Sequence, residues 1–343
     1  MLSVLISRSA AIPEFKSKGY SEVKRLGKGA FGYAILVRRE DELLVAKLIR
    51  YSHMSKANKE YIHREVQAMK TISENGGHPF HVRFRQSFKT GMWLAIVMDY
   101  CDSGDLQARI KGQREANEPF KEGLVQSWLA KLLTAVDFLH KSKILHRDIK
   151  PANIFMHHHD EIKLGDLGLS KCGQAVTVEQ EHTQCGSPMY LAPEVHMGAT
   201  YSKSVDIWAI GCTLFEMMML KPAFQGKNVE DTLRNIVNAR YGDITGCWDN
   251  GMVYSLEKML ELNSKDRPGT MQLFGFPYFR RLVCSRELPA EAFKHRPGFF
   301  QHLIDSSGAP INNSYYDDDL LSDEIIHDSM LTHYSSAHIV DAM

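Results

Sequence analysis

The sequence predicts an α+β protein in which a small strand-rich part is followed by a larger helical part. Apolar residues recur at helical spacing over 122–140 and in further segments up to about residue 281. The pattern changes at 99–104, which predicts a hinge between the parts. Three β-favouring runs lie near the start, at Tyr20 to Leu26, Tyr33 to Arg38 and Leu43 to Ile49.

The remaining elements follow in order along the chain. Residues 55–74 place apolar side chains at helical spacing, and Gly76-Gly77-His78-Pro79 predicts the end of that helix. The apolar run 92–98 predicts a buried strand, and shorter strands are expected at 153–156 and 161–165.

The composition is that of an ordinary globular protein. The chain has 343 residues, of which 44% are apolar and 24% charged, and this excludes a collagen-like or wholly disordered chain. Basic and acidic residues number 41 each, so a general nucleic-acid-binding role is not expected. The length suggests two domains or one large two-lobed domain.

The charges are unevenly distributed. No Lys or Arg follows Arg296, whereas eight acidic residues do, so residues 1–296 carry 41 basic and 33 acidic groups. We therefore expect an acidic extension at 282–343, disordered from about residue 305 and a candidate segment for binding a partner.

Targeting and redox signals are weak. No segment reaches the roughly 18 apolar residues of a membrane span, and residues 1–18 are expected to be a short disordered lead-in. The six cysteines contain no CxxC pair, which favours free thiols in a reducing, cytoplasmic compartment.

Gly27-Lys28-Gly29-Ala30-Phe31-Gly32 is a GxGxxG pattern followed by a predicted strand. A dinucleotide-binding loop would precede a helix instead. Because glycines let backbone amides approach phosphate oxygens, the segment is a candidate phosphate-binding hairpin. On this motif alone, an ordinary glycine hairpin is an equally good interpretation.

Lys47 lies in the third predicted strand, where burial of its charge would require a partner. Glu65 on the following helix is a candidate partner. Without further motifs, a surface lysine and an unrelated glutamate explain the pattern better.

Three further motifs decide the interpretation. His146-Arg147-Asp148-Ile149-Lys150-Pro151-Ala152-Asn153 is followed by Asp166-Leu167-Gly168 and then by Ala192-Pro193-Glu194. With the glycine loop, Lys47 and Glu65, they match the protein-kinase signature in order and spacing. Residues 19–281 thus resemble a eukaryotic-type Ser/Thr protein kinase.

This resemblance implies a bilobal protein-kinase-like fold, with an N-terminal antiparallel sheet lobe that carries one regulatory helix (19–98), a hinge (99–104) and a mainly α-helical C-terminal lobe (105–281). It also implies ATP and Mg²⁺ as cofactors, with Mn²⁺ as a substitute, and protein substrates with Ser or Thr acceptors.

The catalytic roles carry over position by position. Asp148 would accept the proton of the substrate hydroxyl, and Asn153 and Asp166 would hold the metal. Lys47, held by Glu65, would contact the ATP phosphates. Lys150 would neutralise the γ-phosphate, and Ser187 would belong to the substrate platform.

The nucleotide site implied by the resemblance has Met98 as gatekeeper and the backbone of Asp99 and Cys101 facing adenine. Its full set is Gly27, Lys28, Gly29, Gly32, Ala34, Val45, Lys47, Met98, Asp99, Cys101, Asn153 and Asp166.

A narrower resemblance connects the chain to the NIMA-related (NEK) kinases. It rests on Leu94 to Leu106, on Ile144 to Phe155, on Lys163 to Leu169 and on Ser204 to Met217. This family suggests a role in cell-cycle or microtubule regulation, at the cytoskeleton, centrosome, basal body or nucleus.

The resemblance also predicts regulatory and bracing residues. Thr183 matches the activation-loop phosphosite, modified by an upstream kinase or by the chain itself, with Arg147 and Lys171 as receiving cations; the alternative is a plain loop threonine. Asp206 is expected to brace the catalytic loop, and Arg267 to brace Glu194.

Two other interpretations compete with an active kinase. The catalytic residues argue against a scaffold of the pseudokinase type, and the long segment before Ala192-Pro193-Glu194 argues against a small-molecule phosphotransferase. The run His157-His158-His159 suggests a metal site, but on a strand alternate side chains point apart, so a solvated turn is expected.

Overall fold

The computed structural model describes residues 13–29, 32–74, 76–165, 188–199, 202–284 and 288–299. The chain folds as two compact units, one rich in strands and one rich in helices. The described part of the first unit comprises residues 13–77 and 82–100, with the gaps given above. The second comprises residues 78–81 and the described residues from Cys101 onward.

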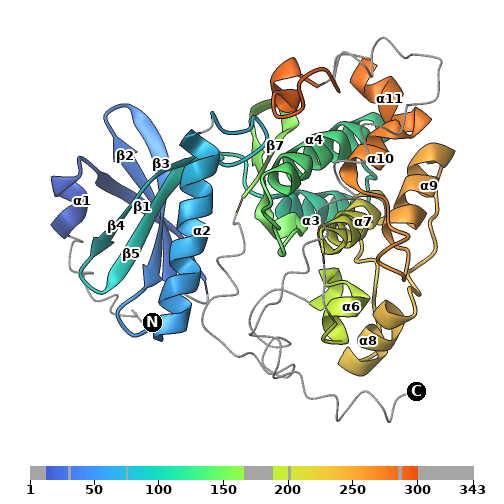
Figure 1. Ribbon diagram of the computed structural model, residues 1–343, viewed down its shortest axis with the longest axis horizontal. Coiled ribbons are helices and arrows are strands. Elements are labelled where there is room, and N and C mark those ends of the chain that lie inside the picture. Colours follow the sequence, from blue (N-terminus) through green and yellow to red (C-terminus); the bar gives the residue numbers. More distant parts are fainter. Residues whose placement is uncertain are drawn as a thin grey trace. The chain divides into compact units, whose positions relative to one another are not determined.

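The first unit is built on a five-stranded antiparallel sheet of order β1-β2-β3-β5-β4 (Figure 1). All the strands pair antiparallel, as short hairpins between neighbouring runs favour. Their bounds are β1 (Ser21–Gly29), β2 (Gly32–Arg39), β3 (Glu42–Arg50), β4 (Phe84–Thr90) and β5 (Trp93–Asp99).

The two faces of this sheet differ in what they carry. One face joins α1 (Pro13–Ser17) through a core of Phe15, Tyr20, Ile35, Val37, Leu44, Ala46, Leu48, Ala95 and Val97. The register pairs Ala34 with Lys47 and Val45 with Met98, so these residues share the opposite face because side chains alternate along a strand. These four residues of the predicted nucleotide site therefore lie on one face of the sheet.

The end of the expected lead-in is ordered, which corrects the disordered segment expected up to residue 18. Phe15 is 4% exposed, and its ring meets Phe88 edge-on with centroids 5.6 Å apart. The helix α2 (Lys56–Glu74) follows β3, as the apolar spacing predicts, and buries Ile62, Met69 and Ile72. Figure 1 shows α1 and α2 on opposite sides of the sheet.

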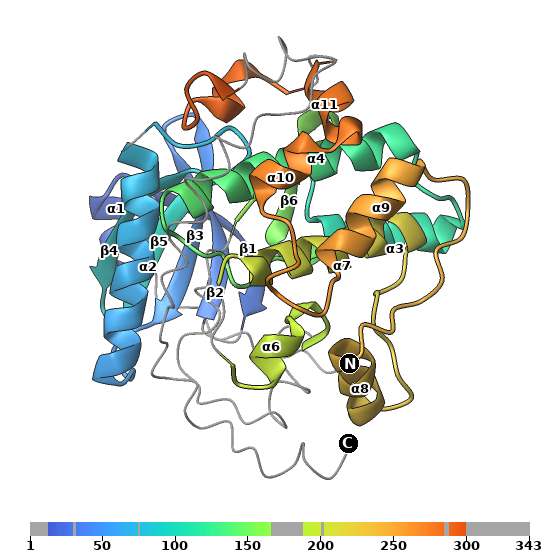
Figure 2. The ribbon, with the colours of Figure 1, turned by 45° about the vertical axis from the view of Figure 1, so that its right-hand side comes forward.

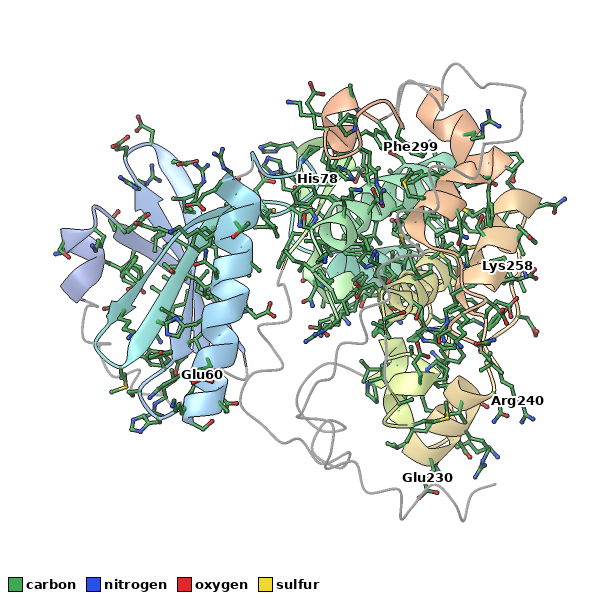
Figure 3. The ribbon with its side chains drawn as sticks, viewed as in Figure 1. Glu60, His78, Glu230, Arg240, Lys258 and Phe299 are labelled. Atoms are coloured by element: carbon green, nitrogen blue, oxygen red, sulfur yellow. The ribbon has the colours of Figure 1, made fainter. Side chains whose placement is uncertain are left out.

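The second unit is organised around two buried helices, α4 (Glu122–Lys141) and α7 (Ser204–Met219), as Figure 2 shows. Figure 3 draws the side chains of this unit, and most residues of both helices are buried. Gly211 lets α7 approach α9 (Asn250–Met259) closely, because a Cβ there would lie 2.9 Å from Met259 Cβ. The other helices are α3 (Leu106–Ala116), α6 (Pro193–His196), α8 (Val229–Val237), α9 (Asn250–Met259), α10 (Thr270–Gly275) and α11 (Pro277–Cys284).

A short hairpin of β6 (Ile154–His157) and β7 (Glu161–Leu164) lies in the second unit, with full antiparallel register. Both strands were expected from the sequence. A 3₁₀ turn, η1 (Pro151–Asn153), precedes the hairpin, and another, η2 (His158–Asp160), connects its strands. Two further 3₁₀ turns are η4 (Pro188–Tyr190) and η5 (Ala290–Phe293).

The chain after α11 returns to α4. Arg296 donates to both carboxylate oxygens of Asp137 at 3.0 Å, and His295 Nε2 lies 2.7 Å from Oδ2. Thr270 Oγ1 donates to Oδ1 at 2.6 Å. Burial alone would raise the pKa of Asp137, but the hydrogen bonds from His295 and Arg296 lower it below its ordinary value. The first part of the expected extension therefore packs on the helical unit.

Candidate active site

The carboxylate of Asp148 is held by two side chains of its own loop. Lys150 Nζ donates to Oδ1 at 3.0 Å and to Oδ2 at 2.9 Å. Asn153 Nδ2 donates to Oδ2 and to the Asp148 carbonyl, each at 2.7 Å. Lys150 and Asn153 thus fix the orientation of the Asp148 carboxylate within the loop.

Asp206 at the start of α7 fixes the backbone of this loop, as the sequence predicts. It accepts from the amides of His146 at 2.9 Å and Arg147 at 2.8 Å, and lies 2.8 Å from His140 Nε2. Burial alone would raise the pKa of Asp206. Several interactions, of which the hydrogen bond from His140 is the largest, outweigh burial and lower this pKa below its ordinary value.

The backbone of this loop has an unfavourable conformation at Arg147, which the bonds to Asp206 support. Arg147 has φ +64°, in the left-handed region that side-chain-bearing residues rarely adopt. His146, fully buried, donates from Nε2 to the Gly165 carbonyl at 2.9 Å and accepts at Nδ1 from the Asp148 amide at 3.3 Å. The loop is thereby tied to the residue that immediately precedes Asp166.

Asn153 fits the metal-binding role expected of it. Its Nδ2 is occupied by Asp148, so Oδ1 is the atom that remains to ligate a cation. An amide oxygen is a ligand that Mg²⁺ accepts, since this hard cation prefers oxygen. With Asp166 it would hold Mg²⁺, which neutralises phosphate charge during phosphoryl transfer.

Within the first unit, residues predicted for the nucleotide site lie on the strands that the sequence predicts. Lys47 and Val45 are half-buried on β3, and Met98 is buried on β5. Ala34 is the cross-strand neighbour of Lys47. Glu65 is half-buried near the middle of α2, in the same unit. Its pairing with Lys47 stays a prediction.

The glycine hairpin joins two strands, which confirms the strand-to-strand interpretation of the GxGxxG pattern. Gly27, Lys28 and Gly29 belong to β1, and β2 begins at Gly32. A Cβ on Gly32 would lie 1.7 Å from the Leu48 carbonyl oxygen, so this position requires glycine for packing alone. The phosphate role expected for Gly32 stays a prediction.

The segment expected to bind adenine begins at the end of β5. Arg85 Nε donates to Asp99 Oδ1 at 2.5 Å and also pairs with Glu42. The Asp99 amide donates to the Arg83 carbonyl at 3.0 Å. Cys101 is buried in the second unit.

Four predicted residues lie outside the described residues: Asp166, Lys171, Thr183 and Ser187. Their roles remain predictions.

One functional residue was missed by the sequence analysis. His140 supports Asp206 from the end of α4, yet in the sequence it is one polar residue in an apolar helix. No local pattern distinguishes it, because its partner is 66 residues away.

The comparisons with known proteins agree with this geometry. Residues 20–279 match the protein kinase domain family. The chain is 33% identical to mouse serine/threonine-protein kinase Nek1 over 80% of its own length and 23% of that protein. For human serine/threonine-protein kinase Nek5 the identity is 32%, over 85% of this chain and 40% of that protein.

The worm relative is of similar size. Serine/threonine-protein kinase nekl-2 of Caenorhabditis elegans is 30% identical over 81% of each chain. By contrast, the present chain spans less than half the length of Nek1 and Nek5. No helix in the described ranges is long and apolar enough to cross a membrane. The chain belongs to the protein kinase domain family and, within it, to the Nek serine/threonine-protein kinases.

Proposed function

We propose that the chain transfers the γ-phosphoryl group of Mg-ATP to Ser and Thr hydroxyls of proteins. The observation that carries the proposal is the carboxylate of Asp148, oriented by Lys150 and Asn153 in a loop anchored on Asp206. Phosphoryl transfer needs positioning and charge neutralisation more than covalent participation by the protein. This loop supplies both.

Each residue of the loop has a distinct role in this proposal. The Asp148 carboxylate receives the hydrogen bond of the substrate hydroxyl and orients it for in-line attack. Lys150, already bound to Asp148, keeps a positive charge beside the position of the transferred group. Asn153 Oδ1, with Asp166, would hold Mg²⁺.

Casein phosphorylation with Mg-ATP tests the proposal. Asp148→Asn keeps the shape of the side chain but removes the charge, and we expect kcat to fall by about 10² to 10⁴. Asp243→Asn, at an exposed position, is the matched control and should retain the wild-type rate. Absence of transfer by the wild-type chain, even after phosphorylation of Thr183, would favour the scaffold alternative.

We propose further that Thr183 is the activating phosphosite and that Arg147 and Lys171 receive its phosphate. A phosphate carries about −1.5 to −2 charges, which guanidinium and ammonium groups bind well. Thr183→Ala should lower the activity, and mapping of the modified residue by mass spectrometry would identify the site. Undiminished activity of this variant would exclude it.

The cellular role is proposed by similarity to the Nek proteins alone. Regulation of cell division or of microtubules is the expected setting, with the protein at the cytoskeleton, centrosome or basal body, or in the nucleus. Fluorescent tagging of the whole chain in its own cells, with a tubulin marker, tests this localisation.

A further inference from the structure

Asp102, His157 and His158 bring three metal-ligating atoms together in the helical unit. Asp102 follows Cys101, whereas the histidines lie at the end of β6 and the start of η2. One donor atom of each side chain lies within 4.8 Å of the other two. We propose that these residues form a binding site for a divalent transition metal of the zinc type.

The distances suit such a metal. Nδ1 of His157 lies 3.3 Å from Asp102 Oδ1, and Nδ1 of His158 lies 2.9 Å from Oδ2. Bonds of about 2.0–2.1 Å in a tetrahedron place neighbouring ligand atoms about 3.3 Å apart. Two imidazoles and one carboxylate are a ligand set that zinc accepts, with water completing the coordination.

Hydrogen bonding to the described residues leaves one nitrogen of the cluster unsatisfied. His157 Nδ1 is buried from solvent, yet it has no hydrogen-bond partner among the described residues. It lies close to a carboxylate oxygen without the geometry of a hydrogen bond to it. A metal ion between the two atoms would satisfy both, since a neutral imidazole nitrogen donates its lone pair to the metal.

Backbone hydrogen bonds hold the segment that follows Asp102 next to the end of β6, which carries His157. Met156 donates its amide to the Gly104 carbonyl at 2.8 Å, and Ser103 donates its amide to the Met156 carbonyl at 3.2 Å. Ser103 Oγ also donates to Asp102 Oδ1 at 3.0 Å, which orients the carboxylate from outside the cluster. The ligand positions are therefore set by the fold.

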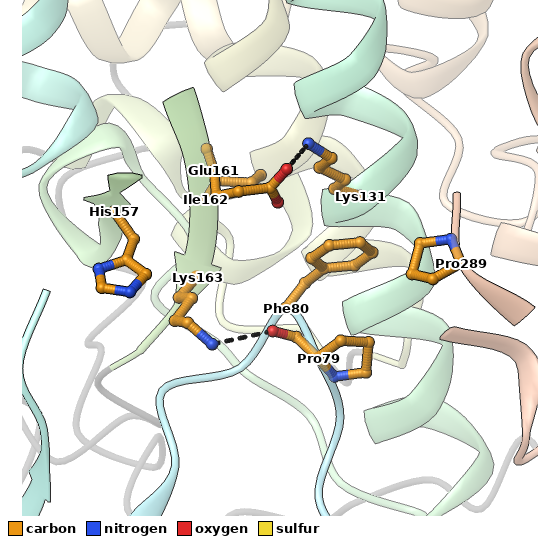
Figure 4. A pocket seen from close by; sticks show the side chains of 8 residues that line it. All are labelled: Pro79, Phe80, Lys131, His157, Glu161, Ile162, Lys163 and Pro289. Carbon is orange, nitrogen blue, oxygen red and sulfur yellow. Dashed lines mark hydrogen bonds and ion pairs between the residues drawn. The ribbon is translucent and has the colours of Figure 1, made fainter. Parts of the chain in front are cut away.

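Neighbouring cations are engaged elsewhere. Lys163 donates to the Pro79 carbonyl at 3.1 Å, and Lys131 pairs with Glu161 at 2.7 Å. These residues and His157 line one cavity of about 320 Å³ (Figure 4). Arg109 lies 3.7 Å from Asp160. Among the described residues, the basic groups that pair with the Asp102 carboxylate are those of the two histidines.

His157 and His158 would point to opposite sides if both lay within a strand. In the structure β6 ends at His157, and the chain turns into η2 at His158, so both rings reach Asp102 and their centroids lie 4.3 Å apart.

Cobalt and zinc titrations of the full chain test the proposal, with Mg²⁺ in large excess to occupy hard oxygen sites. We expect one Co²⁺ per chain, with visible d–d absorption and without the near-ultraviolet charge-transfer band of a thiolate ligand. Zn²⁺ should displace it. His157→Asn, His158→Asn and Asp102→Asn should each weaken binding about tenfold or more, whereas the exposed control His53→Asn should not.

The side chains of Asp102, His157 and His158 are 32%, 34% and 65% exposed, so we expect the three variants to fold. Circular dichroism of the metal-free variants checks this. A zinc-soaked crystal should show an anomalous peak between the two Nδ1 atoms. Unchanged affinity in all three variants, or a thiolate band in the cobalt spectrum, would overturn the assignment. Neither readout depends on kinase activity, so failure here leaves the proposed function intact.

Discussion

Arg267 holds Glu194 through two parallel hydrogen bonds, from Nη1 to Oε1 at 2.6 Å and from Nη2 to Oε2 at 2.8 Å. The arginine side chain is fully buried, and its guanidinium lies 4.9 Å from the centre of the Trp208 ring. This is the brace expected from the sequence. It fixes the Ala-Pro-Glu turn to the interior of the helical unit.

Removing the arginine should be costly because the carboxylate would stay buried without its partner. We expect Arg267→Met to lower the free energy of unfolding by about 3–5 kcal/mol, measured by urea denaturation. Arg234→Met is the control, since Arg234 pairs with Asp231 at an exposed site and should contribute less than about 1 kcal/mol. Equal losses in the two variants would contradict the interpretation.

Asp206 should affect catalysis through the backbone it holds. Asp206→Asn removes the charge and one acceptor atom, so we expect a loss of about 1.5–3 kcal/mol in unfolding free energy together with a lower kcat. His140→Phe leaves both backbone amides bound to Asp206 and should reduce kcat less. Steady-state kinetics measures kcat of the two variants. A lower kcat in His140→Phe than in Asp206→Asn would contradict the role of Asp206 in holding the loop.

The contact of α1 with the sheet should stabilise the first unit. Phe15→Ala leaves a cavity beside Tyr20 and Phe88, and we expect it to cost about 3 kcal/mol. Lys16→Ala, one residue on and exposed, should be nearly neutral. Thermal denaturation of both variants gives the comparison, and similar melting temperatures would show that α1 is not part of the core.

Two buried histidines should make the helical unit sensitive to acid. Burial lowers the pKa of His78 to about 2, aided by His81, and burial lowers the pKa of His81 to about 4. The unfolded chain binds protons near pH 6.5 that the folded chain excludes, so stability falls as the pH drops below that value. Between pH 6.5 and 5 the free energy of unfolding should fall by about 1.6 kcal/mol per histidine.

Urea denaturation at pH 7, 6 and 5 measures this slope. His81→Gln keeps a donor for the Ala135 carbonyl, which His81 Nε2 reaches at 2.9 Å, but cannot titrate. Its stability should therefore depend less on pH than that of the wild type. The exposed His53→Gln should leave the slope unchanged, and an unchanged slope in His81→Gln would refute the assignment.

The sequence predicted what short-range patterns and fixed motifs encode. The catalytic loop and the helix α4 were predicted because their residues are adjacent or periodic. The strand β4 was missed because Phe84–Thr90 alternates weakly and gains its order from pairing with β5. The helix α3 was missed because it buries only Leu106 and Ile110, although Asp105 caps it by accepting from the Ala108 amide at 2.8 Å.

Contacts between distant segments could not be predicted in the same way. The approach of Asp102 to His157 depends on where β6 ends, and the support of Asp206 by His140 depends on how α4 and α7 pack. Neither pair has a local signature in the chain. Side-chain placement across the fold, rather than element type, was the missing information.

The carboxylate of Asp137 has a consequence for how the protein is made. A ribosome synthesises Asp137 long before its partners Thr270, His295 and Arg296, which follow by 133, 158 and 159 residues. Until the last of them emerges, the nascent helical unit would have to bury a charge without its cation. Completion of this unit therefore waits for residue 296, beyond the end of the family match at residue 279.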